Sequence, residues 1–296
     1  MTNASTPSAP PLSPIVAGLW RIADWKLSVQ ERVRWIEQAL ELGITSFDHA
    51  DIYGDYHAEA LFGEALDAAP GLRGRLQLVT KCGIRLRSAQ RPYRVNHYDT
   101  SAMYVRVQVE QSLRNLHTEQ LDRVLIHRPD YLMDASALAE TFAALTREGK
   151  VAHWGVSNHS ASQFALLNHY HPLATNQLEL SPLHMDALDD GTLDQAQRLG
   201  LRPMIWSPLA GGRLFTGEDE QAVRVRAEMR CIAGRHGISL GTLAFAWVLR
   251  HPSRPHPITG TGRIEGLREA VAALNVTLDA EDWYAIWTAS KGHAVP

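Results

Sequence analysis

Residues Leu121 to Asn158, LDRVLIHRPDYLMDASALAETFAALTREGKVAHWGVSN, contain two apolar β-type runs separated by one amphipathic helical segment. The runs are LDRVLIH (121–127) and VAHWGVSN (151–158), and Asp134 stands where the N-cap of the helix is expected. A strand, a helix and a second strand in this order predict two parallel strands joined by a crossover helix. The stretch therefore indicates an α/β protein built on a parallel sheet.

The same alternation runs through the rest of the chain. Further strands are expected at PIVAGLW (14–20), ITSFD (44–48), LQLVTK (76–81), ATNQLELS (174–181), LRPMIWS (201–207) and HPITG (256–260). Helices are expected at 28–43 with a Ser28–Glu31 capping box, around 57–68, at roughly 101–116, after Asp134, after Ser160 or Ser162, and at about 279–290. This series of β–α pairs predicts a closed (β/α)8 TIM barrel, with an open doubly wound sheet as the alternative.

Composition limits the classes of function. The chain has 296 residues, 45% hydrophobic and 21% charged, and its net charge of -3 without a basic block argues against a nucleic-acid partner. With only Cys82 and Cys231, and no apolar run of about 18 residues, we expect no disulfide framework, no membrane span and a cytoplasmic location. The Ser-, Pro- and Ala-rich residues 1–13 are expected to form a disordered tail, which leaves 14–296 as a single domain. Two stretches, residues 84–99 and roughly 25 residues after Ser207, are longer than ordinary βα loops.

Polar residues gather at the ends of the predicted strands. In a parallel barrel, catalytic side chains come from the carboxyl ends of the strands and from the loops that follow. Asp48 ends one strand, with Tyr53 just beyond it in SFDHADIYG (46–54), while Lys81 and His127 end the next two. Each residue taken singly has a structural interpretation as a cap, a packing group or a solvated charge. Their common position at one rim indicates an active site.

These four side chains have a coherent chemistry. A tyrosine phenol, with a pKa of about 10, is a poor acid near neutrality. An ammonium group such as Lys81 stabilises the phenolate and is expected to lower the pKa of Tyr53, while Asp48 keeps Lys81 charged. His127 is placed to orient a carbonyl oxygen near the same hydroxyl. The set predicts a proton donor that faces a carbonyl group.

Six motifs connect these residues with a known family. They are FDHADIYG, VTKCG, LIHRPD, WGVSN, NQLELSP and WSPLAGGRL. In their order and spacing, from about Val16 to the C-terminal helix, the chain resembles the aldo-keto reductases, and most of all their bacterial branch of predicted oxidoreductases. The resemblance implies an enzyme with a nicotinamide cofactor that reduces an aldehyde or ketone reversibly.

The resemblance also implies roles for individual residues. Asp48, Tyr53, Lys81 and His127 would be the catalytic tetrad, with Tyr53 as the general acid. The cofactor would contact Gly18, Ser157, Asn158, Gln177, Trp206, Ser207, Leu209, Gly211, Arg213, Gly260, Thr261, Gly262 and Arg263. Trp20 and Trp25 would line the substrate pocket.

The segment GTGRIEG (260–266) needs a separate interpretation. It nearly matches a dinucleotide fingerprint, but Glu265 occupies the third glycine position and the segment lies near the end of the chain, so we expect no Rossmann site. Thr261 and Arg263 are placed for an adenosine 2′-phosphate. These two residues favour NADP(H) as the cofactor. Gly266 and Ala270 depart from the family pattern, so NAD(H) is kept as the alternative.

Two other functions are compatible with the same fold. The first is a metal-dependent hydrolase, but the spacing of the 14 histidines forms no ligand pattern, and we expect no metal. The second is a regulatory or redox-sensing protein that binds the nucleotide and turns over slowly, against which the complete tetrad argues. The expected partner is a small-molecule carbonyl substrate, and no pattern indicates an oligomeric state.

Overall fold

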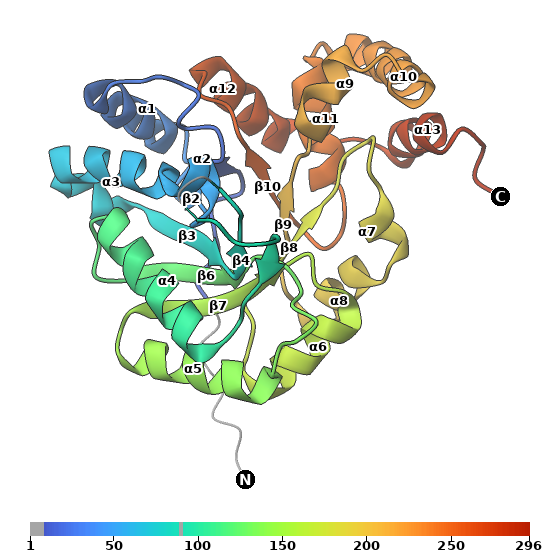
Figure 1. Cartoon of the computed structure of the whole chain (residues 1–296). Helices are drawn as coiled ribbons and strands as arrows, with labels where there is room; N and C mark the ends of the chain where they lie inside the picture. Colours follow the sequence, from blue (N-terminus) through green and yellow to red (C-terminus); the bar gives the residue numbers. More distant parts are fainter. Residues whose placement is uncertain (1–8, 89–90) are drawn as a thin grey trace.

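Eight parallel strands close into a barrel in the computed structural model, which describes residues 9–88 and 91–296 (Figure 1). The strands follow one another around the barrel in the order β1-β10-β9-β8-β7-β6-β3-β2. They are β1 (Val16–Gly18), β2 (Ser46–Asp48), β3 (Gln77–Cys82), β6 (Leu121–Ile126), β7 (Val151–Ser157), β8 (Asn176–Glu179), β9 (Met204–Trp206) and β10 (His256–Thr259). The predicted (β/α)8 barrel is confirmed, and the open sheet is excluded because β1 pairs with both β2 and β10.

Helices surround the barrel strands (Figure 1). They are α1 (Val29–Glu41), α2 (Tyr53–Tyr56), α3 (Ala58–Ala68), α4 (Ala102–Asn115), α5 (Ala135–Arg147), α6 (Ala161–Tyr170), α7 (Asp186–Asp189), α8 (Thr192–Leu199), α9 (Arg213–Thr216), α10 (Glu220–His236), α11 (Leu240–Leu249), α12 (Ile264–Ala272) and α13 (Ala280–Lys291). Three short 3-10 turns, η1 (Pro70–Arg75), η2 (Ala210–Gly212) and η3 (Ala273–Asn275), complete the connections.

The helix boundaries follow local capping chemistry. Ser28 and Glu31 form the predicted capping box at the start of α1, and Gly43 follows this helix with a φ of 79°. Asp134 caps α5 by accepting a hydrogen bond from the Ala137 amide at 3.0 Å. Of the two serines considered for α6, Ser160 is the cap. These signals lie in the sequence itself, which is why the helices begin close to their predicted positions.

Three connections differ from the sequence-based expectation. The helix expected around 57–68 is preceded by the short α2, because Gly54 and Asp55 adopt positive φ angles that break the helix. The long loop 84–99 contains a two-stranded antiparallel hairpin of β4 (Ile84–Arg85) and β5 (His97–Tyr98). The long stretch after Ser207 is mostly helical, because Asp219 caps α10 and apolar residues recur along that helix at helical spacing.

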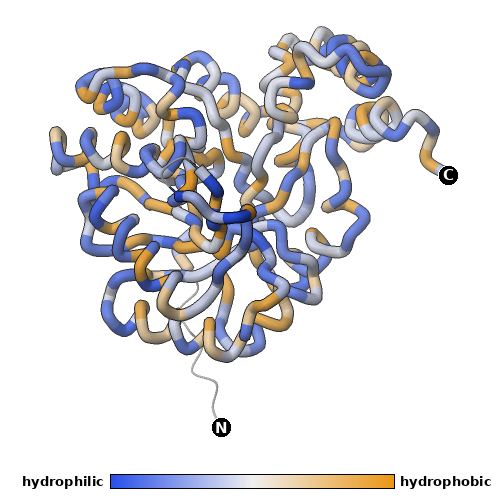
Figure 2. The backbone as a smooth tube through the Cα atoms, in the orientation of Figure 1, coloured by the Kyte–Doolittle hydropathy of each residue, from blue (hydrophilic) through white to orange (hydrophobic). Residues whose placement is uncertain are grey.

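Two apolar layers hold the fold together. Inside the barrel, Leu12, Val16, Val79, Leu125, Met204 and Ile258 form a small buried cluster. A much larger cluster fills the space between the strands and the helices. Hydrophobic and hydrophilic residues alternate along the outer helices, so that each helix has an apolar side (Figure 2). The barrel interior is thus packed, and buried polar groups lie at both of its ends: Ser46, Arg123 and His256 at the amino end, and Asp48 and Lys81 at the carboxyl end.

Part of the predicted tail belongs to the packed structure. Residues 1–8 lie outside the described residues, but Leu12 is only 3% exposed and Ser13 exchanges backbone and side-chain hydrogen bonds with Ser46. Arg123 donates a hydrogen bond to the Pro10 carbonyl. Residues 10–13 therefore pack with the barrel rather than forming a disordered tail, because Leu12 joins the buried cluster inside the barrel while Pro10 and Ser13 form hydrogen bonds with its strands. Within the described part of the chain, no helix combines the length and apolarity that crossing a bilayer requires.

Candidate active site

The predicted tetrad comes together at the carboxyl ends of three neighbouring strands. Asp48 is the last residue of β2, Lys81 lies one residue before the end of β3, and His127 directly follows β6. Tyr53 begins α2, in the loop after β2. Because β2, β3 and β6 are adjacent in the barrel, residues separated by up to 79 positions in the sequence meet at one rim.

Lys81 is the centre of this group. Its Nζ donates hydrogen bonds to both carboxylate oxygens of Asp48 at 2.8 Å and to the His49 carbonyl at 2.6 Å. The same Nζ lies 3.1 Å from the phenol oxygen of Tyr53. Lys81 is completely buried and Asp48 is 3% exposed. The carboxylate therefore fixes the ammonium group in water-excluded surroundings, directly beside the phenol.

Burial and charge act on these groups in opposite directions. Burial lowers the pKa of Lys81, but Asp48 and Tyr53 together raise it above its ordinary value, so the amine stays charged. Burial raises the pKa of Tyr53 and outweighs Lys81, which lowers it. The sequence predicts a lowered phenol pKa, and Lys81 does act in that direction. The prediction is wrong for the net effect, because burial raises the pKa of Tyr53 by more. Tyr53 stays protonated at neutral pH, which suits a proton donor.

His127 completes the group as a neutral imidazole. Burial, Lys81 and Arg128 all lower the pKa of His127, so the ring carries no charge at neutral pH. Its ring lies edge-to-face with that of Tyr53, with 5.9 Å between the centroids. A neutral imidazole with an N–H group beside the phenol can hydrogen bond to an oxygen that the phenol protonates.

A cavity of about 930 Å³ opens directly onto these residues. Three of the four tetrad residues, Asp48, Tyr53 and His127, line it, while Lys81 lies behind them. The residues proposed for the cofactor that also line it are Gly18, Gln177, Trp206, Ser207, Leu209, Gly211, Gly260, Thr261, Gly262 and Arg263. The cavity therefore gathers residues from strands on opposite sides of the barrel.

Three residues predicted to contact a cofactor do not line this cavity. Asn158 accepts a hydrogen bond from Trp206 Nε1 at 3.0 Å, and it donates one to Ser157 at 2.7 Å, so the two support the wall from behind. Arg213 instead donates hydrogen bonds to Asp219 at 2.7 and 2.9 Å and to Gln221 at 2.9 Å. Its guanidinium is thus bound to Asp219, the N-cap of α10. This residue would compete with a cofactor phosphate for the guanidinium, which the motif alone does not reveal.

The two predicted pocket tryptophans have different surroundings. Trp20 lines the cavity and is 58% exposed. Trp25 also lines it, but its ring lies 4.9 Å from that of Trp35 on α1, and a Cβ on Gly262 would approach it to 2.7 Å. Trp20 is therefore at the open mouth, whereas Trp25 lies against the loop after β10.

Several charged residues of the cavity were missed from the sequence. Arg128 follows His127, Glu179 ends β8, and Arg21 and Asp24 come from the loop after β1. The available signal was their position: Arg128 and Glu179 stand at strand ends within motifs already singled out. Charged side chains at such positions are ambiguous without the structure, because the same positions also provide solvated loop residues.

The cavity fits a dinucleotide cofactor. Gly211 and Gly212 have positive φ angles, and a Cβ on either one, or on Gly260, would meet nothing within 4 Å, so the backbone there borders open space. The N-terminus of the nine-residue α12 lies directly beyond, with Arg263 as its N-cap. Exposed backbone N–H groups at a helix start, next to an arginine, form a donor set for phosphate.

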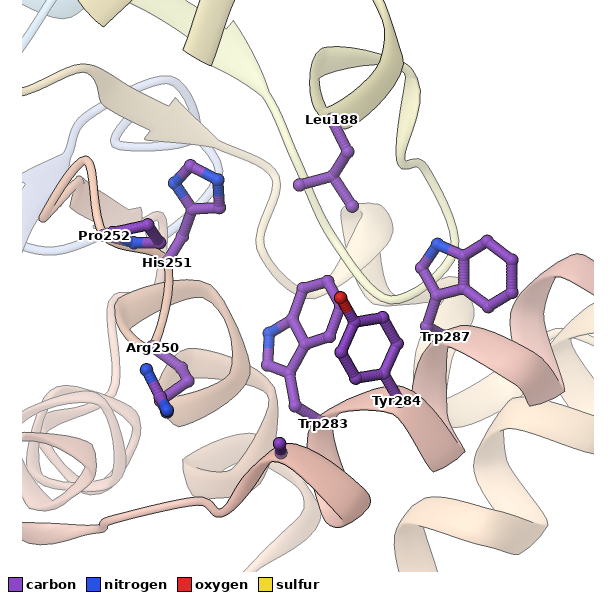
Figure 3. A pocket seen from close by; sticks show the side chains of 8 residues that line it. Leu188, Arg250, His251, Pro252, Trp283, Tyr284 and Trp287 are labelled. Atoms are coloured by element: carbon purple, nitrogen blue, oxygen red, sulfur yellow. The ribbon is translucent and has the colours of Figure 1, made fainter. Parts of the chain in front are cut away.

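A second cavity, of about 490 Å³, lies on the outside of the barrel and carries no such chemistry (Figure 3). Its wall is formed by Ala280, Trp283, Tyr284 and Trp287 of α13, together with Leu188, Arg250, His251 and Pro252. Trp283 stacks on Trp247 with 4.9 Å between the ring centroids. The cavity contains no carboxylate and no buried amine, so we place the reaction at the rim cavity instead.

Two buried polar side chains, His49 and Asp51, lie next to the site without forming part of the cavity wall. Both ring nitrogens of His49 and both carboxylate oxygens of Asp51 have no hydrogen-bond partner. Burial lowers the pKa of His49 to about 3, so its ring is neutral, and burial raises the pKa of Asp51 well above its ordinary value. Among residues 9–88 and 91–296, no three His, Cys, Asp or Glu side chains gather in a way that could hold a metal ion.

Comparisons with known proteins show the family of the chain and support its fold. A model of the Aldo/keto reductase family matches residues 14–291. Oxidoreductase YdhF of Escherichia coli strain K12 is 48% identical over 293 residues, which cover 98% of this chain and 97% of that protein. A 6-dehydroglucose reductase of Agrobacterium fabrum is 43% identical, with 96% of each chain covered. The structure of a glycerol dehydrogenase from Gluconobacter oxydans aligns with a TM-score of 0.84 over 96% of this chain and 93% of that chain; at 24% identity, this likeness concerns the fold alone.

Proposed function

The chain belongs to the aldo/keto reductase family and is an oxidoreductase, and from this premise we propose that it reduces an aldehyde or ketone with NADPH, using Tyr53 as the general acid. The observation that carries the proposal is the position of the buried Lys81 ammonium, 2.8 Å from Asp48 and 3.1 Å from the Tyr53 phenol. Coarser support comes from the relatives, which are named oxidoreductases and reductases.

In the proposed reaction, the residues at the rim move one proton. Tyr53, protonated at neutral pH, donates its proton to the carbonyl oxygen as negative charge develops there. Lys81 stabilises the resulting phenolate through the hydrogen bond already in place, and Asp48 holds Lys81 charged. His127 donates a hydrogen bond from its neutral ring to the same oxygen and so orients the carbonyl group.

We assign the cofactor to the glycine-bordered part of the cavity. A reduced nicotinamide, when bound, supplies the hydride. Trp206 would stack on the ring, Gln177 would position its carboxamide, and Gly18 would allow its close approach. Ser157 and Asn158 would act indirectly, because Asn158 accepts the hydrogen bond that holds the Trp206 indole in place. Ser207, Leu209 and Gly211 would follow the pyrophosphate. Arg213 is not assigned to the cofactor, because Nε and Nη2 of its guanidinium already donate to Asp219 and Gln221.

NADPH is proposed over NADH because of Thr261 and Arg263. Arg263 is exposed at the start of α12, and its backbone N–H donates to Thr261 Oγ1 at 3.1 Å. A 2′-phosphate placed there would meet a guanidinium and a helix N-terminus. The two departures from the family pattern have local reasons: a Cβ on Gly266 would approach the Thr261 side chain to 2.7 Å, and Ala270 is completely buried.

The proposed function is tested by following the absorbance of NADPH and of NADH during incubation with a panel of aldehydes and ketones that includes 6-dehydroglucose. We expect carbonyl-dependent oxidation of the cofactor, faster with NADPH, and unchanged after treatment with a chelator. Cofactor oxidation that no carbonyl in the panel accelerates would contradict the proposal. Activity that disappears with the chelator and returns with added metal would favour a metal-dependent enzyme.

A further inference from the structure

Arg128 is a cation of the rim cavity that the proposed proton transfer does not use. Its Nη1 donates to the His127 carbonyl at 3.2 Å and lies 3.5 Å from Ser157 Oγ, and its guanidinium lies 5.7 Å from the Trp206 ring centroid. The side chain forms no ion pair with any residue that the structure describes. A guanidinium has five N–H donors, and both hydrogen bonds of this side chain use Nη1, which leaves the donors of Nε and Nη2 for a bound molecule in the cavity that Arg128 lines.

Glu179 supplies a matching acceptor on the same cavity. It is the last residue of β8, its side chain is 26% exposed, and the ion-pair partner recorded for it is His184 at 3.7 Å. Burial raises the pKa of Glu179, while His184 and Arg128 lower it, which places the carboxylate within electrostatic reach of Arg128. Arg128 lies in the loop directly after β6, and Glu179 ends β8. One strand, β7, separates β6 from β8, so these two strands are about 10 Å apart at the ordinary strand spacing.

We infer that Arg128 and Glu179 select a neutral, polyhydroxylated carbonyl substrate, with Arg128 donating to its hydroxyl oxygens and Glu179 accepting from its hydroxyl groups. A hydroxyl group is both donor and acceptor, so a diol satisfies both side chains at once. This inference rests on the proposed function, because it concerns the substrate that Tyr53 protonates.

The opposite charges of the pair decide between substrate classes. A purely apolar aldehyde would remove water from Arg128 and Glu179 without replacing their hydrogen bonds, which costs binding energy. An anionic substrate would gain Arg128 but would be repelled by Glu179 on the other side. Only a substrate with several hydroxyl groups next to the carbonyl gains from both. The exposed Trp20 at the mouth of the cavity adds a flat apolar surface, on which the C–H groups of such a molecule can pack.

The test compares three small aldehydes: glyceraldehyde, propanal and succinic semialdehyde. The quantity measured is the ratio of kcat/KM for glyceraldehyde to that for propanal, which cancels effects common to both. Wild type is expected to prefer glyceraldehyde over both other aldehydes. Arg128→Leu should lower the ratio by about tenfold or more, and Glu179→Gln by several-fold, because each removes hydrogen bonds that only the hydroxylated substrate makes. Arg230→Leu, at an exposed position on α10, is the matched arginine control.

Other results would overturn the inference. A preference for succinic semialdehyde would indicate that the cavity binds anionic substrates. An unchanged ratio of kcat/KM for glyceraldehyde to propanal in both variants would show that Arg128 and Glu179 do not recognise the substrate. A weaker Kd for NADPH in Arg128→Leu, measured by fluorescence, with the ratio unchanged, would make Arg128 a cofactor ligand. These outcomes are separable from failure of the proposed function, in which wild type would reduce none of the three aldehydes.

Discussion

The two cavities of this molecule differ in what their walls bury. A carboxylate, a phenol and a neutral imidazole line the rim cavity, with a buried ammonium group directly behind them, whereas the outer cavity is lined by aromatic side chains of α13, one of which stacks on a buried indole ring. Both are open hollows lined by aromatic side chains. The difference indicates that reactivity depends on ionisable groups fixed next to a buried ion pair. A cavity lined mainly by aromatic side chains contributes packing to the fold. Substitutions in the two regions should therefore separate activity from stability.

Lys81→Met should give the largest effect, in both activity and stability. It removes the group that stabilises the phenolate, so kcat for carbonyl reduction should fall by roughly 10²–10⁴. It also leaves Asp48 buried without its cation, at a cost of about 3–5 kcal/mol in the free energy of unfolding. Steady-state kinetics and urea unfolding measure the two losses. Lys150→Met, at an ion-paired lysine outside the rim, is the control; equal losses in both variants would contradict the assignment.

Trp283→Ala tests the outer cavity, where we expect a loss of stability without a loss of activity. The indole stacks on Trp247, and each of the two rings donates to the backbone carbonyl of the other residue at 3.1–3.2 Å. Loss of the ring should lower the free energy of unfolding by about 3 kcal/mol and leave kcat/KM within about twofold of wild type. Tyr284→Ala, on the same wall but 48% exposed, should cost much less. A large loss of kcat/KM in folded Trp283→Ala would connect the outer cavity with the chemistry.

Arg263→Ala sharpens the account of the rim cavity at its cofactor end. Removal of the guanidinium should weaken binding of NADPH by about tenfold or more, since a charge-assisted hydrogen bond is lost, and should affect NADH much less. Fluorescence titration of each cofactor measures the two dissociation constants. Arg268→Ala, one turn along α12 and paired with Glu265, provides the control. Equal weakening of both cofactors would remove the 2′-phosphate assignment.

Asp51→Asn should give the smallest effect, visible only as a dependence on pH. The folded pKa of Asp51 is raised by burial, so its contribution to stability is present below the unfolded pKa of about 3.9 and is lost as pH rises. The variant should therefore gain about 2 °C or more in Tm relative to wild type between pH 4 and pH 8. Thermal unfolding at several pH values measures this, with the exposed Asp55→Asn as the control. A constant difference in Tm would indicate that Asp51 is ionised in the folded protein.

Much of the fold and the composition of the rim could be predicted from the sequence, because both follow from local order. Caps such as Ser28 and Asp134 mark helix starts, and parallel strands bring their carboxyl ends to one rim. This is why the sequence predicts one rim for Asp48, Tyr53, Lys81 and His127, which lie together in the structure, while their catalytic roles are a proposal.

What could not be predicted depends on contacts between distant residues. Arg213 forms an ion pair with Asp219, which competes with any phosphate of a cofactor for the same guanidinium. Nothing in the motif around Arg213 indicates this ion pair. The net rise in the pKa of Tyr53 depends on how completely the fold buries it. Arg128 and Glu179 become a pair only because one cavity contains both. The helical α10 was missed because the length of the connection after Ser207 suggested a loop.

The most direct measurement is the single-turnover rate of hydride transfer in Tyr53→Phe, with NADPH saturating and propanal as substrate. Because the phenol is the proposed proton donor, the account predicts a loss of roughly 100-fold or more in this rate, with the Kd for NADPH within about twofold of wild type. Tyr170→Phe, at an exposed tyrosine of α6, should behave like wild type. Hydride transfer in Tyr53→Phe at the wild-type rate would contradict the central claim that this phenol, held by the buried Lys81, protonates the carbonyl oxygen.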